Sequence, residues 1–172
     1  MLAGLLAILV IGFLVPEKPL IPVEGATRTD WNPKSFWFEP WGQSGVHKGI
    51  DIFAKQGRPV ISAVPGVLIY HGQLGIGGNV VAILGPKWRI HYYAHLAESV
   101  PVPLLVAAGQ QIGSVGTSGN AVGKPPHLHY AVLSIIPLPW RFSTATQGWK
   151  RIFFLDPAEV LEGDTSQVAH AK

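Results

Sequence analysis

Two histidines stand two residues apart in the stretch "GKPPHLHYAV", after two prolines and before an apolar run. Side chains alternate between the two faces of a β-strand, so His127 and His129 would point the same way while Leu128 points into the other layer. Two imidazoles on one face can bind one metal ion, or one can bind the ion while the other acts on a substrate. Two hydrogen-bonded histidines at a strand start would give the same pattern, so the pair needs support from other residues.

That support comes from His47 and Asp51 in the stretch "SGVHKGIDIF". They are four residues apart and face the same way in either a strand or a helix. An imidazole and a carboxylate are both zinc ligands, and with the H-x-H they supply the three protein ligands of a catalytic zinc site, leaving the fourth position open to water. Taken alone, H-x-x-x-D is also explained by a surface ion pair at a turn.

A second pair, His91 and His95, lies in "RIHYYAHLAES", again four residues apart. On a strand the two side chains would share a face. One of them could sit beside a metal without binding it, orienting a water molecule or stabilising an oxyanion. A strand histidine with an ordinary hydrogen-bonded partner is the alternative for each.

The composition limits the classes of protein and of site. The 172 residues suit one domain with a real core, and 20 glycines with 15 prolines favour short elements joined by tight turns over a helical bundle. Cysteine is absent, so a transition-metal site must use imidazole and carboxylate. Lysine and arginine exceed the acids by only 13 to 10 and form no run, so nucleic acid is not indicated as a partner.

The elements that would position these residues are mainly β-strands. Segments rich in strand formers follow Trp31, with glycine or proline between them: "RPVISAVPGVLIYHG", "GNVVAILG", "WRIHYYAHL" and "HLHYAVLSI". The stretch "VAAGQQIGSVGTSG" predicts hairpins, and "DPAEVLEG" predicts a short helix with Pro157 at its first position. We therefore expect residues 31–162 to form one mainly antiparallel β domain, followed by a flexible tail over 163–172.

The N-terminal residues differ in composition from the rest of the chain. Residues 1–15 are all apolar or glycine and would form a helix of roughly 22 Å, shorter than the ~30 Å hydrocarbon core of a membrane. This predicts a signal peptide or a short membrane anchor, although a basic start and a clear cleavage site are missing and a buried helix is the alternative. The proline-rich residues 16–30 then read as an extended linker.

The combined order of H-x-x-x-D, Y-x-H-L, glycine-rich hairpins and H-L-H resembles the lysostaphin/LytM-type zinc endopeptidases, which cut peptide bonds in bacterial peptidoglycan. The resemblance runs from about Val46 to Leu161 and includes "HKGIDI", "YAHL" and "GQQIGSVGTSGNAVGKPPHLHY". It implies an antiparallel sheet, or sandwich, with Zn²⁺ in a groove. It places the metal ligands at His47, Asp51 and His129, and the non-ligand active-site histidines at His95 and His127.

The resemblance further implies that zinc polarises the scissile carbonyl and activates water, while His95 and His127 position that water and stabilise the tetrahedral intermediate. The substrate would be peptidoglycan, reached outside the cytoplasm as an inner-membrane-anchored, periplasmic or secreted protein. A regulatory protein is a further expected partner. Two alternatives stay open: a non-catalytic relative that binds the wall or activates a partner hydrolase, and a carrier-type barrel, although no lysine occupies a suitable hairpin tip.

Some positions depart from the family pattern. His91 stands where the family often has a small hydroxyl residue, and Gly78 where an aromatic residue is frequent. The long stretch "IIPLPWRFSTATQGWKRI", residues 135–152, would form a groove wall in which Trp140 and Trp149 either line the groove or cover the sheet.

Overall fold

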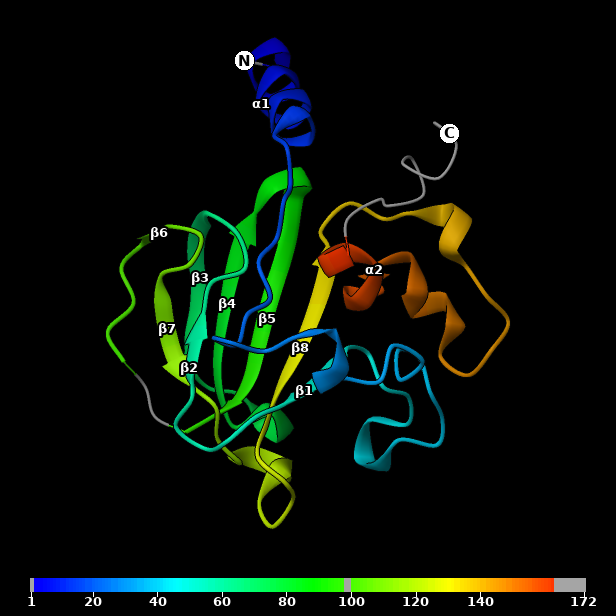
Figure 1. Cartoon of the computed structure of the whole chain (residues 1–172). Coiled ribbons are helices and arrows are strands. Elements are labelled where there is room, and N and C mark those ends of the chain that lie inside the picture. The colour runs from blue at the N-terminus through cyan, green and yellow to red at the C-terminus, as the bar shows by residue number, and fades with distance from the viewer. Residues whose placement is uncertain (1, 98–99, 163–172) are drawn as a thin grey trace, which may run out of the picture.

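The structure, a computed structural model, describes residues 2–97 and 100–162. Its main element is a seven-stranded antiparallel sheet in the order β1-β8-β5-β4-β3-β6, with β9 also paired to β8, beside a two-stranded sheet of β2 and β7 (Figure 1). This confirms the prediction of a mainly antiparallel β fold. The strands are β1 Ile50–Phe53, β2 Pro59–Ile61, β3 Gly66–Gln73, β4 Asn79–Gly85, β5 Arg89–Leu96, β6 Leu105–Val106, β7 Gln111–Ser114, β8 His127–Ser134 and β9 Phe154–Leu155.

Helices are short and lie between or outside the strands. Helix α2 begins at Pro157, as the sequence predicts, and the Asp156 carboxylate accepts a hydrogen bond from the Ala158 N–H at 2.9 Å. The helices are α1 Leu2–Leu14 and α2 Pro157–Glu162, with 3₁₀ turns η1 Arg28–Asp30, η2 Gly42–Ser44, η3 Gly75–Gly77, η4 Pro86–Trp88, η5 Gly119–Ala121, η6 Pro139–Arg141 and η7 Gly148–Ile152.

The two faces of the large sheet have different roles, and β8 shows the division. Leu128, Tyr130 and Val132 are fully buried in the core, which continues into residues of the two-stranded sheet. The residues that alternate with them face a cleft on the other side of the sheet: His127, His129, Ala131 and Leu133. The alternation expected for H-x-H is therefore present, and Leu128 anchors the pair in the core.

The segment expected as a linker is packed against this core. Val23 is buried and forms a β-bridge with Val60, and the Leu20 N–H donates to the Ala63 carbonyl at 2.9 Å. The Glu17 side chain is only 3% exposed and pairs with Arg89. These contacts fix residues 17–23 to the domain, whereas the boundaries expected at residues 15, 30 and 162 stay predictions.

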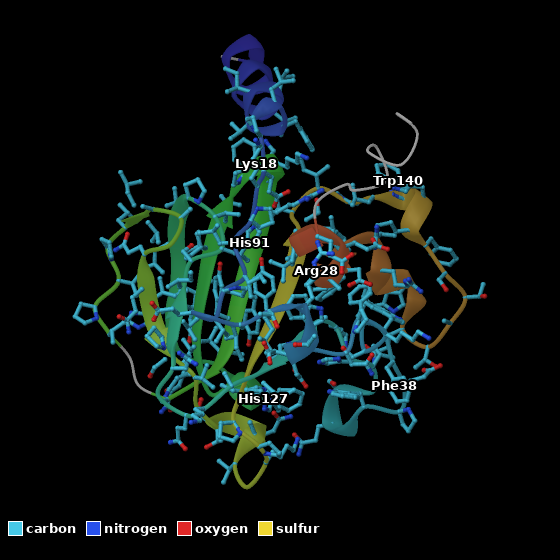
Figure 2. The ribbon with its side chains drawn as sticks, in the orientation of Figure 1. Lys18, Arg28, Phe38, His91, His127 and Trp140 are labelled. Carbon is cyan, nitrogen blue, oxygen red and sulfur yellow. The ribbon has the colours of Figure 1, made fainter. Side chains whose placement is uncertain are left out.

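Helix α1 projects from one end of the large sheet (Figure 1). Its Leu9 carbonyl accepts a hydrogen bond from Trp88 Nε1 at 2.8 Å, which joins it to the turn between β4 and β5. Lys18, just after α1, and His127 lie toward opposite ends of the molecule (Figure 2). Over residues 2–97 and 100–162, no helix has the length and apolar character needed to cross a membrane. The expected flexible tail, 163–172, falls outside the described residues.

Candidate active site

Strand register brings two of the predicted ligands together. Strand β1 pairs antiparallel with β8 so that Asp51 lies directly opposite His129 and Phe53 lies opposite His127. Directly opposed residues on neighbouring strands have Cβ atoms roughly 5 Å apart on the same face of the sheet. His47 comes from the loop that precedes β1. Residues separated by about 80 positions in the chain therefore meet at one place on the sheet.

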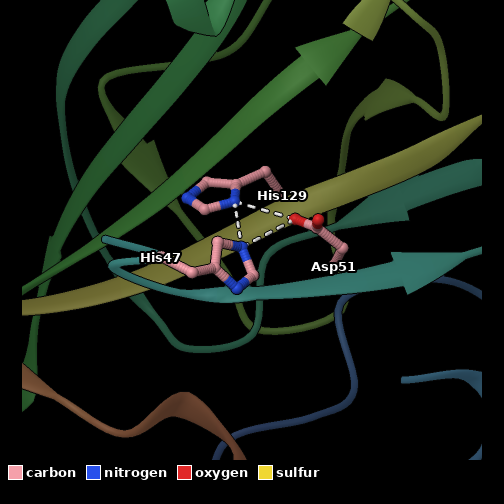
Figure 3. A group of neighbouring side chains, drawn as sticks. All are labelled: His47, Asp51 and His129. Atoms are coloured by element: carbon pink, nitrogen blue, oxygen red, sulfur yellow. Dashed lines mark hydrogen bonds and ion pairs between the residues drawn. The ribbon is translucent and has the colours of Figure 1, made fainter. Parts of the chain in front are cut away.

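The donor atoms of these three side chains point toward one another (Figure 3). His47 Nε2 lies 3.1 Å from Asp51 Oδ1 and 3.2 Å from His129 Nδ1, and His129 Nδ1 lies 2.9 Å from the same carboxylate oxygen. Four tetrahedral ligand atoms at ~2.0–2.1 Å from zinc would be roughly 3.3 Å apart, so the separations are close to those of such a site. Two imidazoles and one carboxylate also form a donor set that suits zinc.

The surroundings of His47 fix which nitrogen faces the cluster. The Ser35 carbonyl, which can only accept, lies 3.0 Å from His47 Nδ1, so Nδ1 carries the proton and Nε2 presents its lone pair. The Trp41 ring stacks on the imidazole with centroids 4.1 Å apart. A Cβ at Gly49 would lie 2.9 Å from the His129 ring, so this position needs glycine for the loop to approach β8.

The electrostatics of the cluster favour an ionised Asp51 carboxylate and a neutral His129 imidazole. Burial would raise the pKa of Asp51, but hydrogen bonds and charge from His129 and His47 outweigh it and hold the pKa below its usual range. Burial lowers the pKa of His129, with Asp51 opposing that shift. Deprotonated ligands are the forms that a metal ion binds.

The two other predicted histidines lie beside this cluster. His127 Nδ1 donates to the Pro125 carbonyl at 2.7 Å, and His95 Nδ1 donates to the Ser118 carbonyl at 2.9 Å. Both Nε2 atoms therefore remain acceptors. The His95 ring centroid lies 5.1 Å from that of His127 and 5.9 Å from that of His129. Burial, followed by the neighbouring imidazoles, lowers the pKa of His95 to about 4, so its side chain is neutral at pH 7.

The expectation that His91 and His95 share a face is wrong. The β4–β5 register advances from Val81 opposite Tyr93 to Asn79 opposite Leu96, which leaves one extra residue on β5. His95 occupies this bulge with φ of +64° and turns into the cleft. His91 remains on the core side, fully buried, where it hydrogen-bonds the Tyr130 hydroxyl at 2.7 Å.

An open cleft of about 630 Å³ surrounds the five residues, and its lining adds side chains that the sequence analysis did not single out. Trp41 and Tyr92 form part of the lining, and Lys48 brings a positive charge. Burial and the nearby Lys150 lower the pKa of this lysine. Lys48 directly follows the predicted ligand His47, and strand alternation places Tyr92 on the cleft face of β5. Both residues could therefore have been predicted to line the cleft from their positions in the sequence.

The tryptophans at 140 and 149 are largely exposed and do not line the cleft. Trp140 is 78% exposed and Trp149 57% exposed, and neither is among the described residues that line the cleft. The segment 135–152 forms instead the 3₁₀ turns η6 and η7, which lead back to β9.

Comparison with known proteins decides the family. Residues 45–135, more than half of the chain, match the profile of peptidase family M23. The chain belongs to peptidase family M23. The M23 match contains β1, β5 and β8, and with them every predicted site residue.

Individual M23 relatives agree with this assignment. The L-Ala--D-Glu endopeptidase of Bacillus subtilis is 41% identical over 115 residues, which cover 61% of this chain and 35% of that protein. The DD-endopeptidase ShyC of Vibrio cholerae is 37% identical over 54% of this chain and 21% of its own length. The chain thus spans about a third or less of these curated relatives.

A solved M23 structure shows the same fold. The catalytic domain of lysostaphin from Staphylococcus simulans superposes with a TM-score of 0.58 at 29% identity, covering 72% of this chain and 86% of that domain. The Csd3 protein of Helicobacter pylori gives a TM-score of 0.51 at 30% identity over 69% of this chain and 30% of that one. Both comparisons support a fold shared with these two proteins.

Proposed function

We propose that this protein is a zinc-dependent endopeptidase that hydrolyses peptide bonds of bacterial peptidoglycan. One observation carries the proposal: the donor atoms of His47, Asp51 and His129 converge within an open cleft, beside two further imidazoles whose Nδ1 atoms donate to backbone carbonyls. Membership of the M23 family, whose relatives are named as endopeptidases, supports the same activity. We assign these three residues as the zinc ligands.

The chain's own residues account for the steps beyond Lewis acidity. A zinc ion held here would supply Lewis acidity toward a scissile carbonyl and an attacking water. The Nε2 lone pairs of His95 and His127 can each accept a proton from that water, and once protonated each can donate a hydrogen bond to the oxyanion or a proton to the departing amine. The backbone carbonyls of Ser118 and Pro125 hold these imidazoles in the tautomer with the proton on Nδ1, which leaves Nε2 able to accept a proton.

The site of action follows from the substrate. Peptidoglycan lies outside the cytoplasmic membrane, so we place the protein there, with the apolar helix α1 as the point of membrane association. His127, which lines the cleft, lies toward the opposite end of the molecule from Lys18, which follows α1 (Figure 2), so a protein held by that helix would keep His127 turned away from the membrane. Recovery of the full chain in the membrane fraction, compared with a variant lacking residues 1–15, tests this placement; a fully soluble full-length chain would contradict it.

The activity is tested on defined muropeptides and purified sacculi. Zinc-loaded protein should release fragments whose masses correspond to addition of one water across a single amide, and a chelator should abolish the release. His129→Ala, purified in parallel, should be inactive and serves as the control for contaminating hydrolases. Absence of cleavage by zinc-loaded protein that is folded and contains one metal per chain would instead favour the non-catalytic alternative.

A further inference from the structure

The charge of the cleft is unbalanced. Among the described residues that line it, Lys48 and Lys124 are the basic side chains, and Asp51 is the single carboxylate. Asp51 is already engaged by His47 and His129. Over residues 2–97 and 100–162, neither lysine has a carboxylate oxygen within 4.0 Å. The unpartnered positive charge creates a potential that attracts anionic ligands into the cleft.

Lys48 is held in place at the wall of the cleft. Its ammonium group donates to the Ser44 carbonyl at 3.0 Å and lies 3.5 Å from the Val46 carbonyl. The Ser44 carbonyl also accepts from Gln147 Nε2 at 2.9 Å, and Gln147 Oε1 accepts from Lys150 Nζ at 2.9 Å. These hydrogen bonds hold the ammonium groups of Lys48 and Lys150 near the loop that contains Ser44. Because an ammonium group has three N–H donors, Lys48 retains at least one for a ligand.

We propose that Lys48 binds a free carboxylate of the substrate close to the scissile bond, which makes the protein selective for acidic peptides over uncharged ones. The inference rests on the proposed peptidase function and narrows its substrate. An acidic stem peptide supplies the required carboxylate, whereas an oligoglycine bridge has no ionisable side chain. Lys150, linked through Gln147 to the Ser44 carbonyl that Lys48 also contacts, adds positive potential, and Lys124, in the part of the lining formed by the loop before β8, adds more.

The experiment compares two peptides that differ only in one charge. Each carries the same cleavable sequence with either glutamate or glutamine beside the scissile bond, and a second pair has that amide N-methylated so that binding is measured without hydrolysis. Fluorescence anisotropy of the labelled N-methylated pair with zinc-loaded full chain gives the ratio of dissociation constants, and kcat/KM on the cleavable pair gives the kinetic ratio.

Wild type should prefer the glutamate peptide by about 10–100-fold, the range expected for a hydrogen bond between charged groups. Lys48→Gln should reduce that preference to about threefold or less, and Lys48→Arg should restore part of it. Lys55→Gln removes the same charge from an exposed position outside the cleft and should keep the wild-type ratio. Raising the salt concentration should lower the wild-type ratio, since ions screen exposed charges.

Equal affinity of wild type for the two peptides would overturn the proposal. A Lys48→Gln variant whose affinity for both peptides falls by the same factor would also overturn it. The preference for glutamate would then be unchanged, and the role of the lysine would be to hold the loop at Ser44. Failure of the proposed function gives a different result: neither cleavable peptide is cut, while the binding ratio of the N-methylated pair still reports on Lys48.

Discussion

Replacing Glu17 by alanine tests whether residues 17–23 belong to the folded domain. The Glu17 carboxylate pairs with Arg89 and accepts a hydrogen bond from His91 Nε2 at 3.1 Å. His91 Nδ1 lies 2.7 Å from the Tyr130 hydroxyl, so the imidazole has a hydrogen-bond partner at each nitrogen. Burial raises the pKa of Tyr130 well above its ordinary value, so the phenol keeps its proton. Loss of the carboxylate leaves the fully buried imidazole without one partner.

The size of the effect follows from the exposure of the two charged groups. Removing one partner of a buried pair costs about 3–5 kcal/mol of unfolding free energy. The side chain of Glu17 is 3% exposed, but that of Arg89 is 21% exposed and can recover some hydration. We therefore expect Glu17→Ala to lower the free energy of unfolding by about 2–4 kcal/mol, a large part of the ~5–15 kcal/mol typical of a domain.

Urea unfolding followed by circular dichroism measures this change, with chelator present so that metal binding does not add to stability. Glu24→Ala is the matched control, because Glu24 directly follows this segment, is exposed and has no ion pair with the described residues. It should change stability by less than ~0.5 kcal/mol. If Glu17→Ala costs no more than this control, the contact is not a stabilising one and the segment behaves as the linker that the sequence suggested.

Three further predictions concern the cluster and its neighbours. Gly49→Ala should weaken zinc binding at least ~10-fold in chelator competition, because its Cβ would meet the Tyr130 carbonyl at 2.5 Å and the His129 ring at 2.9 Å, whereas Gly4→Ala, with open space around it, should not. His95→Ala and His127→Ala should each lower kcat by ~10²–10⁴-fold in the muropeptide assay while zinc stays bound, and loss of zinc from either would contradict their assignment as non-ligands. The free energy of unfolding of the metal-free protein should fall as the pH falls from ~6.5 to about 4. The pKa of His95 is low in the folded state, so the unfolded chain binds more protons in this range of pH. If His95→Gln leaves the pH dependence of chemical denaturation unchanged, His95 is not the cause.

Strand alternation explains what the sequence could predict about the site. The placement of His127 and His129 on one face, with Leu128 in the core, depends only on the local period of a strand, and the structure confirms it. The meeting of Asp51 with His129 depends instead on the register between β1 and β8. Spacing within the chain contains no information about that register; the ligand types suggested that these residues meet, and the family resemblance supported it.

Two features escaped local rules because longer-range contacts decide them. The bulge at His95 breaks the alternation with His91, and its cause lies in the pairing of β5 with β4. The proline-rich segment before Trp31 suggested an extended linker, but its Val23 forms a β-bridge with Val60 and is buried in the core. Composition contains no information on this packing partner, which the tertiary fold determines.

Zinc content of purified variants tests the central claim most directly. Wild type, His127→Ala, Asp51→Ala and His129→Ala would be loaded with zinc, dialysed against a weak chelator and measured by elemental analysis, with circular dichroism to confirm folding. We predict about one zinc per chain for wild type and His127→Ala, and almost none for Asp51→Ala and His129→Ala. Folded Asp51→Ala or His129→Ala protein that still retains one zinc per chain would contradict the assignment of this cluster as the metal site.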